Sequence, residues 1–145
     1  ELGKQIGGLG NRLGEFVEGV VRPGLVRLFR EKGIAVHQTL RDLEAKRDGE
    51  AAQIDLLVVN DDHAIAVEVK SKLAESDVDE HAERLEKFKR LFPQYKATHL
   101  LAAVAAMVIP ESAALYAEKR GMFVIGQKGD DAVLLNSEGF APRAW

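Results

Sequence analysis

The residues best placed to do chemistry are Asp55, Glu68 and Lys70, which lie on two short apolar segments around a polar turn. The segments are Ile54–Val59 and Ala64–Val69, and the four residues between them read Asn-Asp-Asp-His, so we expect a β-hairpin. In antiparallel register Asp55 faces Glu68, and facing Cβ atoms lie about 4.5–5.5 Å apart. The sequence therefore predicts two carboxylates side by side, with the Lys70 ammonium further along the same face.

The same register fixes the neighbours of these three residues. Val59 would pair with Ala64 beside the turn, and Gln53 would lie across from Lys70. Gln53 could then hold the Lys70 ammonium or an attacking water, or it could make a simple hydrogen bond of the sheet. The residues leave both interpretations open.

Two carboxylates this close repel each other unless a cation or a proton lies between them. A hard divalent cation such as Mg²⁺ or Mn²⁺ removes the conflict, because it prefers oxygen ligands. The plainer interpretation makes Glu68 and Lys70 solvent-facing residues and Asp55 the start of a strand. Both segments are otherwise almost entirely apolar, and a carboxylate pair with a lysine in a buried sheet favours a functional site.

These residues resemble the core motif of the PD-(D/E)XK nuclease superfamily, which includes restriction endonucleases and Holliday junction resolvases. The motif consists of Asp55, twelve intervening residues and then Glu68-Val69-Lys70, although Ile54 replaces the proline that often precedes the aspartate. Three runs also resemble a bacterial family of unknown function within that superfamily: LGEFVEG at 13–19, IDLLVVND at 54–61 and EVKSKL at 68–73. The resemblance covers residues 13 to 136.

The resemblance implies that Asp55 and Glu68 bind Mg²⁺ or Mn²⁺ together with the main-chain carbonyl of Val69. Lys70 would orient the attacking water and stabilise the developing negative charge. In the superfamily a glutamate on the helix before the sheet completes the metal site. By that analogy Glu15 is the expected helix acid, and Glu18 is the alternative.

The resemblance also implies an α/β fold with a restriction-endonuclease-like αβββαβ core, a central mixed sheet flanked by helices. An extra helix and a strand pair follow at the C-terminus. The sequence pattern predicts the elements in that order. They are a helix from Asn11 broken at Pro23-Gly24, a helix at Leu25–Lys32, a strand at Ile34–Leu40, an exposed loop at Arg41–Glu50, the hairpin, a helix from a Ser76–Asp79 capping box to Pro93, a strand at Thr98–Ile109, a helix at Glu111–Arg120, and strands at Met122–Ile125 and Ala132–Leu135.

The chain has 145 residues, of which 46% are hydrophobic, and this length suits one globular domain. It contains no cysteine, so disulfides and thiolate metal sites are excluded. The longest apolar run, Leu100–Ile109, is too short to span a bilayer, and we expect a cytoplasmic protein with no membrane partner. The four histidines show no ligand spacing and are expected to be surface or structural residues.

The N-terminal segment, residues 1–12, has a heptad-like spacing of apolar residues but several glycines. It would be either the end of an upstream coiled coil or linker, or a helix packing on its own domain. The domain proper would then be residues 13–145. The chain begins without methionine, which indicates a fragment or a processed product, and a coiled coil here would make a homodimer.

We therefore expect a metal-dependent nuclease that hydrolyses phosphodiester bonds of a nucleic acid, with DNA expected before RNA. The net charge of −3 is not that of a typical nucleic-acid binder. A basic row on the helix before Pro93 could contact phosphates, or it could form an ordinary salt-bridged surface; its residues are Arg84, Lys87, Lys89 and Arg90. The alternative is a catalytically silent nuclease-like module for dimerisation or partner binding.

Overall fold

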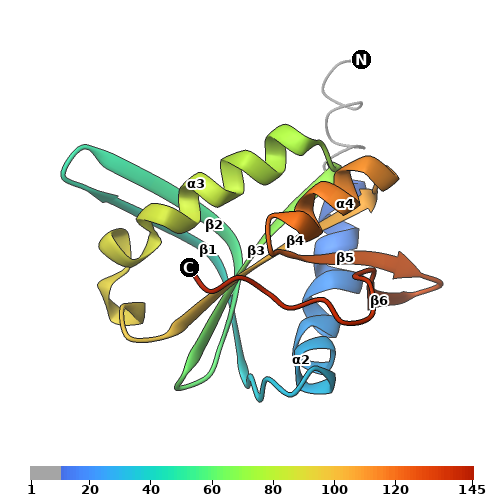
Figure 1. Ribbon diagram of the computed structural model, residues 1–145, viewed down its shortest axis with the longest axis horizontal. Helices are drawn as coiled ribbons and strands as arrows, with labels where there is room; N and C mark the ends of the chain where they lie inside the picture. Colours follow the sequence, from blue (N-terminus) through green and yellow to red (C-terminus); the bar gives the residue numbers. More distant parts are fainter. Residues whose placement is uncertain (1–10) are drawn as a thin grey trace.

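The computed structural model describes residues 11–145, which form an α/β fold around one six-stranded mixed sheet (Figure 1). The strands lie in sequence order across the sheet, and β3, β4 and β5 are parallel while the other neighbours are antiparallel. Their bounds are β1 Gln38–Arg47, β2 Glu50–Val59, β3 His63–Lys72, β4 His99–Val108, β5 Phe123–Lys128 and β6 Asp131–Leu134.

Helices cover both faces of the sheet (Figure 1). They are the π-helical turn η1 Val17–Val21, α2 Arg22–Glu31, α3 Glu75–Leu91, the 3₁₀ turn η2 Pro93–Tyr95 and α4 Glu111–Lys119. The element order is therefore helix, three strands, helix, strand, followed by a helix and a strand pair, as the αβββαβ prediction requires. Within the described part of the chain, no helix combines the length and apolar character needed to cross a membrane.

The first helical segment continues through the position where a break was predicted. Residues 11–16 are helical, and the π turn η1 leads directly into α2. Pro23 lies in the first turn of α2, directly after the π turn, in which the Arg22 N–H bonds to the Val17 carbonyl, so the proline falls where the helical hydrogen-bond pattern changes. The expected domain boundary at residue 12 lies within the helical residues 11–16, whereas most of the expected coiled coil falls on residues 1–10, outside the described residues.

The predicted loop at Arg41–Glu50 is wrong, because most of this segment belongs to β1 and the turn is confined to Asp48-Gly49. The first strand also begins at Gln38 and not at Ile34. The charged residues that suggested a loop are mostly on the exposed side. Leu43 and Ala45 pack against the core from the other side. Two neighbouring strands, β1 and β2, thus form a long ribbon that extends from the body of the sheet (Figure 1).

Helix α3 begins at Glu75, two residues earlier than a Ser76 cap would place its start, and it uses a different cap. The carboxylate of Asp77 accepts a hydrogen bond of 2.9 Å from the Ala74 N–H, so the predicted Ser76–Asp79 box does not form. The helix ends at Leu91, just before Pro93, as predicted. This start turns Asp77 and Asp79 toward different partners on the rest of the molecule.

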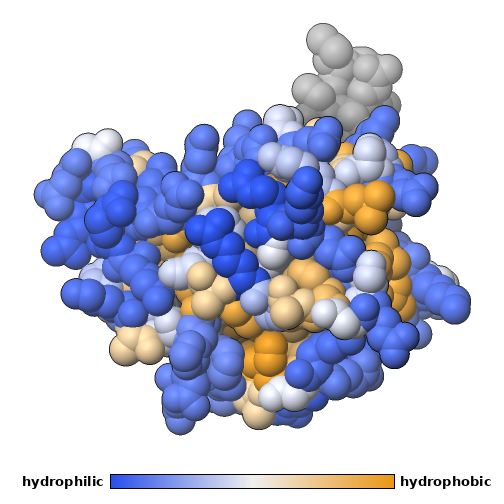
Figure 2. All heavy atoms as spheres, in the orientation of Figure 1, coloured by the Kyte–Doolittle hydropathy of each residue, from blue (hydrophilic) through white to orange (hydrophobic). Residues whose placement is uncertain are grey.

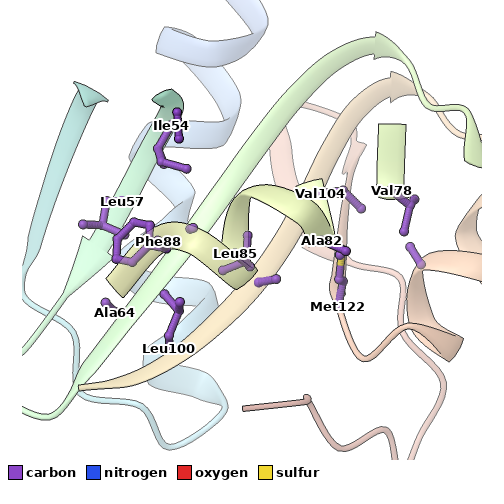
Figure 3. Packing of buried hydrophobic residues seen from close by; sticks show 14 of the residues in the cluster. Ile54, Leu57, Ala64, Val78, Ala82, Leu85, Phe88, Leu100, Val104 and Met122 are labelled. Carbon is purple, nitrogen blue, oxygen red and sulfur yellow. The ribbon is translucent and has the colours of Figure 1, made fainter. Parts of the chain in front are cut away.

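Two apolar clusters lie on the two faces of the sheet. Phe88 of α3 packs over Leu57 and Leu100 on one face (Figure 3), and Phe29 of α2 packs against Phe123 on the other. Because both faces of the central strands are covered, their sequences are continuous apolar runs. A polar side chain on one of these strands is therefore buried wherever it lies beneath a helix.

We predict that Phe88→Ala lowers the free energy of unfolding by about 3–5 kcal/mol, because it removes a fully buried ring from the cluster beneath α3. Urea denaturation followed by circular dichroism measures this change. The control is Leu115→Ala, which truncates a side chain that is 55% exposed and should change stability by less than about 0.5 kcal/mol. Equal effects of the two substitutions would contradict the described core.

Candidate active site

The site lies where strands β2 and β3 separate. Their antiparallel ladder runs from Val59↔Ala64 to Leu56↔Val67 and stops there. Beyond that point the β1–β2 ribbon diverges from β3, and α3 crosses over the opening (Figure 1). Asp55 is the first residue of β2 past the last ladder pair, so its side chain lies at the opening.

An irregularity in both strands of the ribbon marks the same place. Asp42, which the register sets opposite Asp55, has a φ of 52°, in the left-handed region. On either side of Asp55, Ile54 and Leu57 contact the same core cluster, although a regular strand would send them to opposite faces. The local twist thus frees the position of Asp55 from the core on both faces.

The structure brings the carboxylates of Asp55 and Glu68 into contact. Asp55 Oδ2 accepts a hydrogen bond of 2.9 Å from the Val69 N–H, which the ended ladder leaves without a strand partner. The Asp55 side chain also forms a hydrogen bond with the side chain of Glu68. Only 8% of Glu68 is exposed, so this pair is largely withdrawn from water.

Val69 supplies a third oxygen on the same edge. In an extended strand, the N–H and C=O of one residue point toward the same neighbouring strand. Since the Val69 N–H points to Asp55, its carbonyl also faces the opening between β2 and β3. The main-chain ligand implied by the resemblance is therefore oriented toward the carboxylate pair.

Burial raises the pKa of Glu68 to about 8, and the neighbouring carboxylate of Asp55 adds to this effect. The positive charges of Arg84 and Lys70 act in the opposite direction but do not cancel it. At neutral pH the two carboxylates therefore share one proton. A metal cation could displace this proton, because it reduces the same repulsion between the two carboxylates.

Arg84 of α3 is the cation closest to the pair, and sequence reasoning treated it only as one member of a surface row. Its guanidinium forms an ion pair with Glu68 and lies 3.3 Å from Nδ1 of His81. His81 Nε2 lies 3.0 Å from the Ala66 carbonyl oxygen, and burial lowers the His81 pKa to about 4. A neutral His81 that donates to Ala66 leaves Nδ1 free to accept from Arg84. The signal in the sequence was the i, i+3 spacing of His81 and Arg84 beside the buried stripe of the helix.

Lys70 and Gln53 do not face each other, because the ladder between their strands has already ended. Lys70 Nζ lies 3.5 Å from the Asp77 carboxylate, and the lysine side chain is 37% exposed. Gln53 is exposed and lines a hollow of about 420 Å³ together with Arg84. The expected pairing of Gln53 across from Lys70 is therefore wrong, while Lys70 itself lies on the same strand as Glu68 and on the same side, toward α3.

Glu15 does not join the pair, and Glu18 lies closer to it. A cavity of about 120 Å³ is lined by Asp55, Glu18 and Arg41, whereas Glu15 lines a separate hollow with Gln127. The helical phase explains the difference, since the π-helical turn that begins at residue 17 rotates the following residues. Glu18 pairs with Arg41 and Arg22, and these contacts lower its pKa.

The oxygen set fits a hard divalent cation. Two carboxylates and a main-chain carbonyl converge on one opening, and Mg²⁺ and Mn²⁺ prefer such ligands with waters completing the shell. Among the described residues, no group of three or more His, Cys, Asp or Glu side chains is gathered around one point. The protein would thus supply two side chains and leave the remaining positions to water or substrate.

Comparison with known proteins identifies a family but no activity. A family model for a domain of unknown function, DUF8196, matches residues 23–133. No curated protein matches the chain. A solved structure described as a protein of unknown function, AF1548, aligns with 17% identity and a TM-score of 0.44. That alignment covers 70% of this chain and 54% of the other, so this chain spans about half of that protein.

We predict that stability falls as the pH rises through 8, because of Glu68. Its pKa in the folded protein is about 8, above the value of 4.5 for a free glutamate, so the folded state holds the proton more tightly. The contribution is complete below pH 4.5 and is lost as the pH passes 8. Relative to Glu68→Gln, which cannot ionise, the wild type should lose on the order of a few kcal/mol between pH 5 and pH 9.

Urea denaturation at several pH values, without divalent cations, measures this difference. Glu80→Gln on the exposed side of α3 is the matched control and should keep the pH dependence of the wild type. Parallel stability curves for the wild type and Glu68→Gln would show that Glu68 has an ordinary pKa.

Proposed function

Since the chain belongs to the DUF8196 family, whose function is unknown, we propose its activity from the site alone: a metal-dependent nuclease that hydrolyses phosphodiester bonds, with DNA as substrate. The observation that carries the proposal is the contact between the Asp55 and Glu68 carboxylates at the opening of the sheet. A buried pair of this kind is unfavourable for folding, and a catalytic cation gives it a purpose.

Each residue of the site has a chemical role in this proposal. Asp55, Glu68 and the carbonyl of Val69 would hold the cation, which when bound lowers the pKa of a water ligand and offsets charge on the phosphate. Lys70 lies near the same opening on a flexible stem, and its half-buried ion pair with Asp77, at 3.5 Å, would exchange for a contact with the substrate. It would orient the attacking water and donate to a phosphate oxygen.

After Lys70, Arg84 would be the second positively charged side chain to contact the substrate. Its guanidinium neutralises Glu68 in the described structure, and a metal at Glu68 would take over that task. Arg84 also lines a hollow of about 420 Å³, whose other charged lining residues are Lys87, Glu44, Glu80 and Glu83. Because three of these are acids, the substrate phosphate would meet Arg84 at the opening and not in this hollow. His81 holds the guanidinium from the other side and would keep it beside the site.

The order of elements supports the same proposal. The αβββαβ order places the acid and the Glu-x-Lys motif on the second and third strands, as in the superfamily that the motif resembles. A nuclease acting on cellular DNA would work in the cytoplasm, and we include that location in the proposal. The net charge of −3 is no obstacle, because cations need only gather near the opening.

A silent module remains the second candidate, and the ion pairs favour it. Arg84 already pairs with Glu68, and Lys70 pairs with Asp77, so both cations are engaged by acids of the protein itself. In a silent module these pairs would be permanent and would stabilise the fold. The protein would then serve dimerisation or partner binding through another surface.

We predict metal-dependent cleavage that requires Lys70 but not Lys72. Lys70→Gln should reduce the cleavage rate by at least about 100-fold, because the reaction loses a cation beside the phosphate. Lys72→Gln is the matched control, since Lys72 lies two residues further along β3 and is exposed. Plasmid, branched DNA and RNA are incubated with Mg²⁺, Mn²⁺ or chelator, and the products are separated on gels.

The same assay decides between the two candidates. Cleavage that chelator abolishes and that Lys70→Gln reduces supports the nuclease, and preference for RNA would correct the substrate. Complete inactivity on all three nucleic acids with either metal would favour the silent module.

We also predict that Mn²⁺ binding releases a proton at pH 7. The Glu68 pKa of about 8 means that the pair is protonated before the cation enters, and the cation displaces that proton. As the pH increases toward 8, affinity for Mn²⁺ should therefore rise about tenfold for each pH unit, and it should level off above pH 8. Titration calorimetry in two buffers of different ionisation enthalpy measures the protons released. Glu68→Gln should bind weakly and release none, and a pH-independent affinity of the wild type would contradict the protonated pair.

A further inference from the structure

We propose that the domain has a second binding site, for a small aromatic acid, at the opposite end of β3. The site is a cavity of about 430 Å³, named here the tail cavity. Its apolar lining includes Leu101, Phe123 and Phe140, and its polar lining consists of Lys32, His63 and His99. The proposal is independent of the nuclease site, because residues 63 and 68 are separated by roughly 17 Å along the strand.

The apolar wall is a fixed part of the fold. The Phe123 ring meets Phe29 and Phe140 edge-on, with centroids 5.1 and 5.4 Å away. The C-terminal tail is hydrogen-bonded to the sheet region, with 3.0 Å from the Arg143 N–H to the Gly121 carbonyl and 2.8 Å from the Trp145 N–H to Leu100. In Figure 2 an apolar patch lies low on the face where Figure 1 shows this tail crossing the sheet. The cavity therefore exists before any ligand arrives.

The polar wall is made of hydrogen-bond donors that can carry positive charge. His63 and His99 lie side by side at the starts of β3 and β4, with ring centroids 5.3 Å apart. Nδ1 of His63 is buried and makes no hydrogen bond with any described residue. Lys32 follows α2 and forms no ion pair within residues 11–145. Of the acids in the described part of the chain, none lines the cavity.

Charge and shape together define the ligand class. A volume of about 430 Å³ lies in the range of small-molecule sites, and its mainly apolar lining suits a flat ring system. The basic groups at one side would receive a carboxylate, which no acid of the lining opposes. We therefore assign the cavity to an aromatic carboxylate of one or two rings.

The test uses 2-naphthoate as the acid and 2-naphthalenemethanol as its neutral counterpart. Each is titrated into the ¹⁵N-labelled protein, and amide shifts are followed by NMR. We expect shifts centred on residues 32, 63, 99 and 140, and naphthoate affinity at least about tenfold higher than that of the alcohol. Lys32→Gln should remove most of this difference while leaving the affinity for the alcohol unchanged.

A pair of tail variants tests the location. Ala144→Trp places a large ring in the cavity and should weaken naphthoate binding at least about tenfold, because Ala144 is exposed and lines it. Ala141→Trp is the matched control, since Ala141 is exposed on the same tail but is not part of the lining. The spectra themselves show whether each variant is folded.

Four results would overturn the proposal. Equal affinities for the acid and the alcohol would show that the basic groups do not select an anion. Shifts centred on other residues, or equal effects of the two tail variants, would show that the cavity is not the site. Shifts that depend on protein concentration, with sedimentation as a dimer, would assign the face to a second copy of the chain.

Discussion

The repulsion between two carboxylates beneath a helix is the constraint around which this domain is arranged. Asp55 and Glu68 lie in contact although only 8% of Glu68 is exposed. An apolar pair at these positions would stabilise the sheet at lower cost. The fold instead compensates the acids with a proton, with the Val69 N–H and with the guanidinium of Arg84. In the proposed function, a bound cation would take over the role of the proton and of the Arg84 guanidinium.

The surrounding elements leave the acid pair at an opening of the sheet. The ladder between β2 and β3 stops one pair before the acids, and the left-handed residue Asp42 turns the ribbon away. Helix α3 crosses the resulting opening. Its Asp77 forms an ion pair with Lys70, and its His81 lies beside the Arg84 guanidinium. The floor of the site is thus β3, in the middle of the sheet, and its wall is made by side chains of α3.

The sequence was sufficient to predict the hairpin and the acid pair, because two almost entirely apolar segments flank a short polar turn, and the turn fixes the register. It failed where tertiary contacts override local composition. The charged segment at Arg41–Glu50 looks like a loop, yet Leu43 and Ala45 pack on the core and draw it into β1. Local periodicity also cannot reveal where the ladder ends, and for this reason Gln53 was expected across from Lys70.

Long-range placement limited the prediction of the rest of the site in the same way. The choice between Glu15 and Glu18 depends on a π-helical turn that no pattern of apolar residues indicates. Arg84 looked like one cation in an alternating surface row, and only the packing of α3 over β3 sets it beside Glu68. Asp55, Glu68 and Lys70 were recognisable because their strands are otherwise apolar.

The most direct test of the central claim is a crystal structure of the protein grown with Mn²⁺, with anomalous scattering recorded to locate the ion. The account predicts a peak between the Asp55 and Glu68 carboxylates, within about 2.0–2.4 Å of their oxygens, with the Arg84 guanidinium moved away from Glu68. A map that shows the two acids still hydrogen-bonded to each other, and manganese elsewhere or absent, would contradict it.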